Sequence, residues 1–478
     1  MWNLEQFSKK IALIDDRGNS LTYEQLLLEG NRLCNAISNS NDGNTRCLVF
    51  NMCSNVLGSA VGYISFLNNK VVPAMLKDDL DEDLLKDLYD GYKPAYIWTG
   101  NEWCKRVLFK NLEVVYTALG YSLLKTPFGN QTRLHKDLAL LLTTSGSTGS
   151  PKFVRQSYTN IRSNTDSIIQ YLHLDATERP ITTLPMNYTY GISIINTHID
   201  TGATILLTDK TLMQREFWTF FKENNATSFG GVPYTYEMLK RLRFFRMNLP
   251  SLKTMTQAGG RLLPELHKEF AEYAKEQDKQ FVVMYGACEA TARMGWLPPQ
   301  KSIEKQGSMG IAIPGGRFEL IDSDGTVFDD CDKVGELVYY GPNVTLGYAT
   351  NATDLVKADE RNGRYETGDM AKRDSDGFYY IVGRKKRFLK IFGNRVNLDD
   401  CERMLKENFD GSEVACGGVD DKLYIFSLSD EKLLKMKVFL SEKTGLNTVA
   451  FETVKVDSIP KNESGKILYK ELEKYYNE

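Results

Sequence analysis

Short apolar runs alternate with helical patterns along most of this chain, and this rhythm constrains the fold more than any other sequence feature. In the first part, the runs at 47–50 and 70–73 predict buried strands, and Thr22 is placed to cap a helix that starts after it. The rhythm resumes after residue 137, with strands expected at 138–142, 181–184, 204–207 and 281–284 and helices at 214–223 and 264–276. Strands that alternate with helices predict layers of parallel α/β structure.

The pattern of apolar and turn-forming residues changes at about residue 317. Short strands expected at 317–322, 335–340 and 378–382 are separated by turns rich in Gly, Asp and Asn, which predicts a small β-rich subdomain. The last stretch, 388–478, carries both helix and strand patterns. A chain of 478 residues is too long for one core. We therefore expect a large N-terminal domain of layered α/β subdomains plus a small β subdomain, followed by a small C-terminal α+β domain.

Composition and charge argue against several classes of protein. Hydrophobic residues make up 42% and charged residues 25%, so disorder is not expected, and the net charge of -3 gives no reason to expect a nucleic-acid partner. No signal peptide is recognisable, and no stretch approaches the roughly 20 apolar residues that membrane insertion requires. The eight cysteines form no Cys-x-x-Cys pair, which favours free thiols in a cytoplasmic protein. The four scattered histidines argue against a zinc site or a His-based triad.

A loop of Ser, Thr and Gly follows the buried strand expected at 138–142. Backbone N–H groups at glycines can close around an anion, hydroxyls add donors, and a lysine adds positive charge. The spacing differs from that of the Walker loop, and the pattern alone favours phosphate binding over a flexible surface loop. The residues that would bind phosphate are Thr144, Ser145, Gly146, Ser147, Thr148, Gly149 and Lys152.

Three later segments carry residue types suited to a nucleotide. Tyr285 follows a buried strand and its ring can stack on a purine, while Glu289 offers the oxygen ligands that Mg²⁺ requires. Taken singly, Tyr285 fits a core aromatic equally well and Glu289 fits a solvated charge. The glycine pair at 259–260 permits close backbone approach, although an ordinary turn has the same pattern. Lys466, taken in isolation, is typical of a solvated side chain.

Together these segments resemble the motifs of the adenylate-forming superfamily, which includes acyl-CoA synthetases, peptide-synthetase adenylation domains and firefly luciferase. The matching segments are 143–152, 285–289, 365–369, 383–396 and 460–466, in the family's order over nearly the whole chain. Phe153 stands where the family has glycine, and Glu366 where it has arginine. Cys288 replaces the threonine that usually contacts the α-phosphate, and a thiol is a weaker donor than a hydroxyl.

The resemblance implies a role for each matching side chain. Lys466 would act in the first half-reaction, and Glu289 would hold Mg²⁺ beside ATP. The remaining residues expected to contact the nucleotide are Gly259, Gly260, Arg261, Tyr285, Gly286, Cys288, Asp369 and Arg384.

The resemblance also implies a movable C-terminal domain. Lys386 occupies the pivot position of a hinge at 385–387, which would separate a large domain at 1–384 from a small domain at 388–478. Gly393 lies where the family threads a pantetheine thiol past the rotated small domain.

The implied reaction is the ATP-dependent conversion of a small carboxylic acid to an acyl-adenylate, with release of pyrophosphate. A pantetheine thiol, of coenzyme A or of a separate acyl carrier protein, would then take the acyl group. Asn187 and Tyr188 are expected to line the acyl pocket. No aspartate lies between 184 and 196 to pair with an α-ammonium, which favours a fatty or aromatic acid. An amino-acid-activating enzyme and a nucleotide-binding relative without turnover remain open alternatives.

Overall fold

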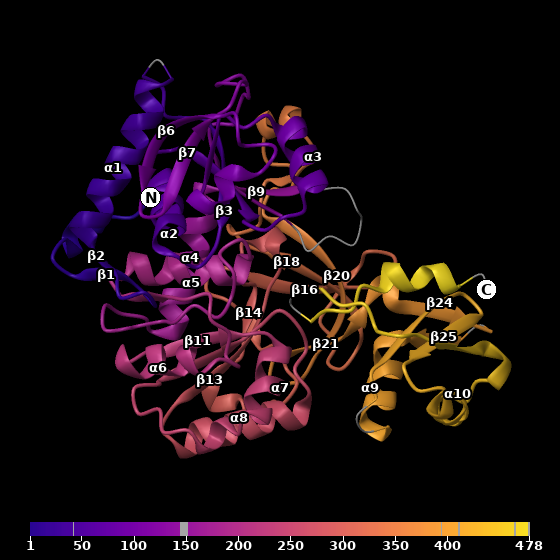
Figure 1. The fold of residues 1–478 in the computed structure, drawn as a ribbon. Helices are drawn as coiled ribbons and strands as arrows, with labels where there is room; N and C mark the ends of the chain where they lie inside the picture. The colour runs from indigo at the N-terminus through magenta and orange to yellow at the C-terminus, as the bar shows by residue number, and fades with distance from the viewer. Residues whose placement is uncertain (42, 144–151, 393, 410–411, 463–464, 477–478) are drawn as a thin grey trace. The chain divides into compact units, whose positions relative to one another are not determined.

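The computed structural model describes residues 1–41, 43–143, 152–392, 394–409, 412–462 and 465–476. The chain divides into two compact units, drawn in Figure 1. The first unit comprises Met1–Arg317 and Tyr340–Tyr365, and the second comprises Phe318–Tyr339 and Glu366–Glu478. Each unit has its own sheets and is described by itself.

An eight-stranded mixed sheet is the largest layer of the first unit, in the order β19-β9-β8-β4-β3-β5-β7-β6. Its strands are β3 (Leu48–Cys53), β4 (Val72–Lys77), β5 (Tyr96–Gly100), β6 (Glu113–Ala118), β7 (Tyr121–Lys125), β8 (Leu138–Thr143), β9 (Phe153–Ser157) and β19 (Gly347–Ala349). The central strands are parallel, and the outer pairs are antiparallel. Helix α2 (Leu57–Asn68) packs against β3, β4 and β5 and is buried on nearly all sides, as expected of an almost wholly apolar helix.

A second sheet of the first unit has the order β11-β12-β13-β14-β15. Its strands are β11 (Ser228–Gly231), β12 (Thr254–Gln257), β13 (Gln280–Tyr285), β14 (Gly295–Trp296) and β15 (Ile311–Ala312). The first three are parallel, so their carboxyl ends lie at one edge of the sheet, where ligands of open α/β sheets commonly bind. Helices α7 (Pro233–Arg241) and α8 (Pro264–Glu276) pack against β11 and β13.

The first unit is completed by a small sheet and further helices. The sheet has the order β10-β1-β2, built from β10 (Ile205–Leu207), β1 (Ile11–Asp15) and β2 (Ser20–Thr22). The other helices are α1 (Tyr23–Asn39), α3 (Glu82–Tyr92), α4 (Tyr158–Leu172), α5 (Thr189–Asp200) and α6 (Arg215–Glu223). Thr22 caps α1, because its hydroxyl accepts a hydrogen bond from the Gln25 backbone while the Gln25 side chain caps Thr22 in return.

The second unit carries a five-stranded sheet of order β17-β16-β18-β20-β21 and two smaller sheets, β22-β23 and β24-β25-β26. The strands are β16 (Arg317–Ile321), β17 (Val327–Phe328), β18 (Gly335–Tyr340), β20 (Arg364–Arg373), β21 (Tyr379–Arg384), β22 (Phe388–Ile391), β23 (Asn394–Asn397), β24 (Val414–Val419), β25 (Lys422–Ser427) and β26 (Phe451–Lys455). Helices α9 (Leu398–Asn408) and α10 (Asp430–Thr444) pack against β24 and β25.

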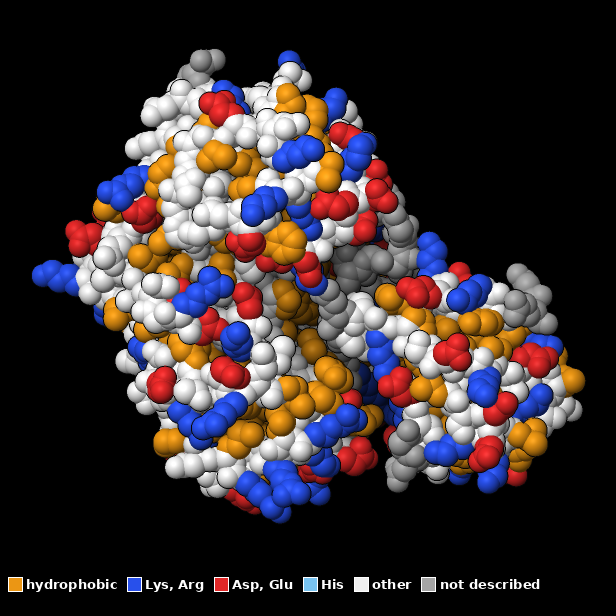
Figure 2. Space-filling view, viewed as in Figure 1, with side chains coloured by type: hydrophobic (Ala, Val, Ile, Leu, Met, Phe, Trp, Pro, Cys, Tyr) orange, Lys and Arg blue, Asp and Glu red, His pale blue; other side chains and the backbone are white. Residues whose placement is uncertain are grey.

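The predicted architecture matches these elements closely. The helix expected at 264–276 and the strand expected at 335–340 are found with those bounds. The segment 181–184 is the exception, because it forms only isolated bridges at Pro180 and Ile181 rather than a strand. Within the described part of the chain, no helix is both long and apolar enough to cross a membrane. Acidic and basic side chains are interspersed on the face of each unit that Figure 2 shows.

His267 of α8 is a buried histidine whose surroundings keep it neutral. Its Nδ1 accepts a hydrogen bond from the Gly307 N–H at 3.2 Å, and its Nε2 therefore donates to the Ser302 hydroxyl at 2.9 Å. Burial lowers the pKa of His267 to about 4 from an ordinary value of 6.5. The unfolded chain therefore takes up a proton between pH 6.5 and 4 that the folded chain does not.

We predict that the first unit loses up to about 3 kcal/mol of folding free energy as the pH falls across this window, and that His267→Gln removes that dependence. Urea unfolding followed by circular dichroism at pH 7 and at about pH 4.5 tests this. The exposed His173 provides the matched control His173→Gln. An unchanged pH slope in His267→Gln would contradict the assignment.

Candidate functional site

Strands β8 and β9 flank the predicted phosphate loop. They pair antiparallel, with Thr143 opposite Phe153, so the loop starts and ends at the same point of the large sheet. Residues 144–151, which include the predicted ligands from Thr144 to Gly149, lie outside the described residues. Lys152 is described, and its ammonium lies 3.9 Å from the ring centroid of Tyr348 in β19. This cation–π contact holds the lysine at the end of the loop.

Tyr348 also touches the predicted magnesium ligand. Its hydroxyl donates to Glu289 Oε1 at 2.5 Å. Burial, together with the Glu289 charge, raises the pKa of Tyr348 to about 12, so the hydroxyl stays a donor at neutral pH. One tyrosine therefore joins Lys152 to Glu289, although the two lie far apart in the sequence.

The backbone of Glu289 is fixed by three further donors. The N–H and the hydroxyl of Thr345 each donate to the Glu289 carbonyl at 3.0 Å, and Arg361 Nη1 donates to the same carbonyl at 3.1 Å. The Arg361 guanidinium also lies 4.8 Å from the Tyr348 ring centroid. The segment that contains Thr345, Tyr348 and Arg361 therefore holds Glu289 in place.

Arg155, a fully buried residue of β9, ties that segment to the large sheet. Its guanidinium donates to the carbonyls of Leu346, Tyr348, Lys357 and Ala358, and it forms an ion pair with Glu360 at 2.5 Å. A buried cation is stable only when its donors are satisfied, and here they are. Arg155 carries no local sequence signal of this role, because all of its partners lie about 200 residues further along the chain.

The predicted purine site lies at the carboxyl end of β13. Tyr285 is the last residue of that strand and is half-buried. At Gly286 a Cβ atom would come within 1.6 Å of the Ala292 carbonyl oxygen, so only glycine fits. The glycine lets the chain turn back tightly, which brings the 3-10 turn at Cys288–Ala290 next to Tyr285.

The glycine pair follows the carboxyl end of β12, the neighbouring strand. Gly259 has a positive φ of 86°, and a Cβ there would come within 2.7 Å of the Tyr188 hydroxyl. The buried Gln257 side chain donates to the Gly260 carbonyl at 2.9 Å and shapes the turn. Arg261 is exposed beyond it. The structure therefore brings the predicted glycine pair and the predicted acyl-pocket tyrosine together.

Asn187 and Tyr188 immediately precede helix α5. Burial raises the pKa of Tyr188 to about 12, with a smaller contribution from the Cys288 thiol, which places that thiol near the tyrosine. Asn187 Oδ1 is buried and accepts no hydrogen bond within the described part of the chain. A buried amide oxygen that accepts no hydrogen bond costs free energy. The Asn187 oxygen is therefore suited to accept a hydrogen bond from a ligand.

In the second unit, two of the residues expected to contact the nucleotide meet across a pair of strands. Asp369 of β20 lies opposite Arg384 of β21, and their side chains approach to 3.7 Å. Gly368 has a positive φ of 71°, and the Thr367 hydroxyl accepts a hydrogen bond from the Asp369 N–H at 3.0 Å. The turn chemistry of this motif therefore sets the direction of the Asp369 carboxylate.

The predicted hinge at 385–387 lies in a single 3-10 turn. Lys385 forms an ion pair with Glu336 at 2.7 Å, and the buried Arg387 forms one with Glu402 at 2.7 Å. The side chain of Lys386 lies outside the described residues, as does Gly393. The pivot role of Lys386 therefore stays a prediction.

Lys466 lies in a turn of the second unit that two hydrogen bonds close. Its N–H donates to Asn462 Oδ1 at 2.9 Å, and its carbonyl accepts from the Asn462 N–H at 2.9 Å. Tyr469, three residues later, stacks on the Arg387 guanidinium at 3.6 Å and donates to Glu402 at 3.0 Å. This buried network connects the segment after Lys466 to the hinge turn.

The donor set near Glu289 suits Mg²⁺. Within the described residues, Glu289 accepts only the Tyr348 hydrogen bond on its carboxylate, which leaves the second oxygen for a cation. Also within those residues, no group of three or more His, Cys, Asp or Glu side chains could hold a metal ion. Mg²⁺ needs no such cage, because one carboxylate together with substrate phosphates and water commonly binds it.

Comparison with known proteins identifies the family of this chain. The family model described as AMP-binding enzyme matches residues 1–349. The chain therefore belongs to the AMP-binding enzyme family. It is 27% identical over 355 residues to an oxalate–CoA ligase of Arabidopsis thaliana, covering 69% of this chain and 66% of that enzyme. It is 28% identical over 347 residues to a 2-succinylbenzoate–CoA ligase of Bacillus licheniformis, covering 70% of each chain.

Solved structures agree with the fold over the whole chain. The O-succinylbenzoate coenzyme A synthetase of Bacillus subtilis in complex with AMP has a TM-score of 0.77 at 20% identity, covering 99% of this chain and 98% of that one. The same enzyme with ATP and a magnesium ion has a TM-score of 0.74 at 20% identity, covering 98% of each. The predicted family, fold class and enzyme class of AMP-forming acid–thiol ligase are confirmed, and ATP and Mg²⁺ are the predicted cofactors.

We predict that Tyr348→Phe weakens MgATP binding about tenfold, because Glu289 loses the hydrogen bond that holds it as a ligand. Isothermal titration with MgATP, and with AMP without magnesium, measures the effect. The affinity for AMP should stay unchanged. Tyr340→Phe is the control, since Tyr340 contacts Arg317 and Arg364 rather than Glu289. Equal loss of both affinities would show that Tyr348 has a general structural role instead.

Proposed function

We propose that this protein activates a small carboxylic acid with ATP, forming an acyl-adenylate and pyrophosphate, and then passes the acyl group to a pantetheine thiol. The observation that carries the proposal is the group Lys152, Tyr348 and Glu289. It puts a cation and a carboxylate fit for Mg²⁺ at the end of the predicted phosphate loop. Family membership and its CoA-ligase relatives support the same reaction.

The main barrier to this reaction is electrostatic, because an anionic acid must approach a polyanion. Lys152 and the loop at 143–152 would hold the phosphates, and Lys466 would bridge the acid and the α-phosphate. Mg²⁺ bound by Glu289 would add charge neutralisation at the phosphates. Asp369 would accept both ribose hydroxyls, with Arg384 beside it. No general base is required, since the acid is already ionised.

The acceptor is proposed to be coenzyme A rather than a carrier protein, because the curated relatives reported above are CoA ligases. In the second step the thiol attacks the adenylate carbonyl and AMP leaves. We propose that movement at Lys386 separates the two steps and that Gly393 lines the thiol path. All eight cysteines are free of disulfides, which is consistent with the proposed cytoplasmic location.

The activity is tested with ATP, Mg²⁺, hydroxylamine and a panel of single acids. We expect pyrophosphate release and an acyl-hydroxamate with at least one acid that lacks an α-amino group. Hydroxamate formation from amino acids alone would favour an amino-acid-activating enzyme. AMP binding without release of pyrophosphate for any acid would instead identify a nucleotide-binding relative without turnover.

We predict that Lys466→Ala lowers acid-dependent pyrophosphate exchange by at least about 100-fold, while thioester formation from a preformed acyl-adenylate survives. The reason is that the lysine stabilises charge only while the carboxylate attacks phosphorus. Lys461→Ala is the matched control, because Lys461 is in the same segment and forms an ion pair with Glu413 at 3.0 Å. Equal loss of both half-reactions in Lys466→Ala would contradict this division of roles.

A further inference from the structure

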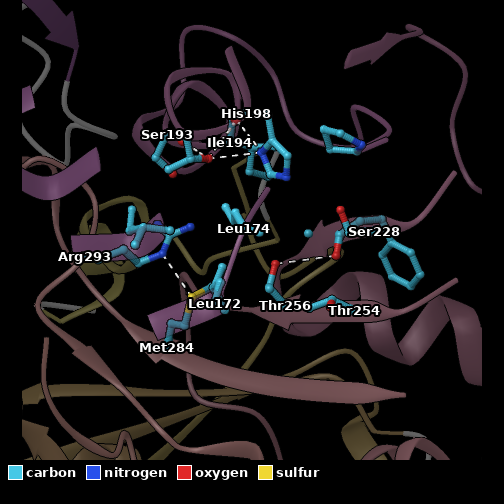
Figure 3. Close-up of a pocket in the computed structure, with 15 residues that line it drawn as sticks. Leu172, Leu174, Ser193, Ile194, His198, Ser228, Thr254, Thr256, Met284 and Arg293 are labelled. Atoms are coloured by element: carbon cyan, nitrogen blue, oxygen red, sulfur yellow. Dashed lines mark hydrogen bonds between the residues drawn. The ribbon is translucent and has the colours of Figure 1, made fainter. Parts of the chain in front are cut away.

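The internal cavity of the first unit has room for water but not for an acyl chain. It lies between helices α4 and α5 and the parallel strands β11, β12 and β13, and its volume is about 30 Å³ (Figure 3). Hydroxyls that border it already have acceptors within the protein, since Ser193 donates to the Tyr190 carbonyl at 2.7 Å and Thr197 to the Ser193 carbonyl at 3.0 Å. A group of buried side chains in the second unit bears more directly on the proposed reaction.

Arg387, the last residue of the predicted hinge turn, lies at the centre of this group. It exposes 8% of its surface, and each of its three guanidinium nitrogens has an acceptor. Nε donates to Asp399 Oδ1, Nη1 to the Cys416 carbonyl and Nη2 to Glu402 Oε1, each at 2.7 Å. A buried guanidinium bonded in three directions allows few alternative arrangements of its partners.

Tyr469 completes the group from the chain segment that carries Lys466. Its hydroxyl donates to Glu402 Oε2 at 3.0 Å, the other oxygen of the carboxylate that Arg387 binds. Its ring centroid lies 3.6 Å from the Arg387 guanidinium carbon. Burial, together with the Glu402 charge, raises the pKa of Tyr469 well above its ordinary value, so the hydroxyl remains a donor near neutral pH. Tyr469 is therefore held by its ring and by its hydroxyl.

Only two residues separate Tyr469 from Lys466, and the backbone between them is bonded to the chain that precedes the lysine. The Leu468 N–H donates to the Pro460 carbonyl at 2.8 Å, and the Lys466 N–H donates to Asn462 Oδ1 at 2.9 Å. A shift of Tyr469 therefore passes directly to the Lys466 backbone.

We propose that Tyr469, held by Arg387 and Glu402, is a positioning residue that sets the place of Lys466 for adenylate formation. The inference rests on the proposed function, which assigns Lys466 to the first half-reaction. A misplacement of about 1 Å in an active site costs up to about 100-fold in rate, so the lysine needs a fixed backbone. Because Arg387 belongs to the predicted hinge turn, the place of the lysine is also tied to that turn.

Tyr469→Phe tests the proposal, because it removes the hydroxyl and keeps the ring that packs on Arg387. With an acid that the wild-type enzyme accepts, we expect kcat for pyrophosphate exchange to fall about tenfold, while KM for ATP and for the acid stays within about twofold. Thioester formation from a preformed acyl-adenylate should also stay within about twofold. Tyr475→Phe is the matched control, since Tyr475 lies in the same 3-10 helix and packs on Phe426 instead.

Two further measurements separate positioning from general destabilisation. In a Lys466→Ala background, Tyr469→Phe should cause no further loss of pyrophosphate exchange, because its effect acts through the lysine. In the free protein, hydrogen–deuterium exchange of the peptide that contains Lys466 and Leu468 should be faster in Tyr469→Phe than in Tyr424→Phe. Tyr424→Phe removes a different hydrogen bond of the same terminal segment, from the Tyr424 hydroxyl to the Tyr476 carbonyl at 2.6 Å.

Three results with the variants would overturn the inference. These are unchanged pyrophosphate exchange in Tyr469→Phe, equal loss of both half-reactions in Tyr469→Phe, and a further tenfold loss when Tyr469→Phe is added to Lys466→Ala. A wild-type enzyme that shows no pyrophosphate exchange with any acid would instead overturn the proposed function, and the inference with it.

Discussion

The buried guanidinium of Arg155 is the interaction on which the nucleotide site of the first unit depends. Strand β9 leaves the predicted phosphate loop, and Arg155 binds four carbonyls and Glu360 of a segment about 200 residues away. That segment carries Tyr348 and Arg361. Because a buried cation with satisfied donors allows few alternative arrangements, Tyr348 is held under Lys152 and against Glu289. The chemistry of the site thus depends on a residue that touches no substrate.

Charge explains why the functional residues are of these types. Histidines are few, and His198 and His267 are buried with lowered pKa values, so general-base chemistry has little support. The proposed reaction needs cations near phosphate and one carboxylate for Mg²⁺ instead. The buried cation Arg155 has its anion, Glu360, within the protein.

Local sequence patterns were sufficient to predict much of the fold and some of the candidate site residues. The spacing of apolar and turn residues predicted β18 and α8. The family resemblance named Asp369 and Arg384 as nucleotide contacts, and the structure pairs them across two strands. Contacts between distant segments carry no such local signal. No role was predicted for Tyr348 or Arg155, because each acts through partners that only folding brings near. The expected strand at 181–184 was wrong because a buried apolar run is also compatible with an extended loop that makes two bridges.

The central claim is that an oxygen of the acid attacks the α-phosphorus of ATP. It is tested most directly by running the complete reaction with a carboxylate labelled with oxygen-18 and analysing the nucleotide product by mass spectrometry. The account predicts AMP that carries one labelled oxygen, because the bond between the acid oxygen and phosphorus survives when the thiol displaces AMP. Unlabelled AMP, or label found in inorganic phosphate or pyrophosphate, would contradict it.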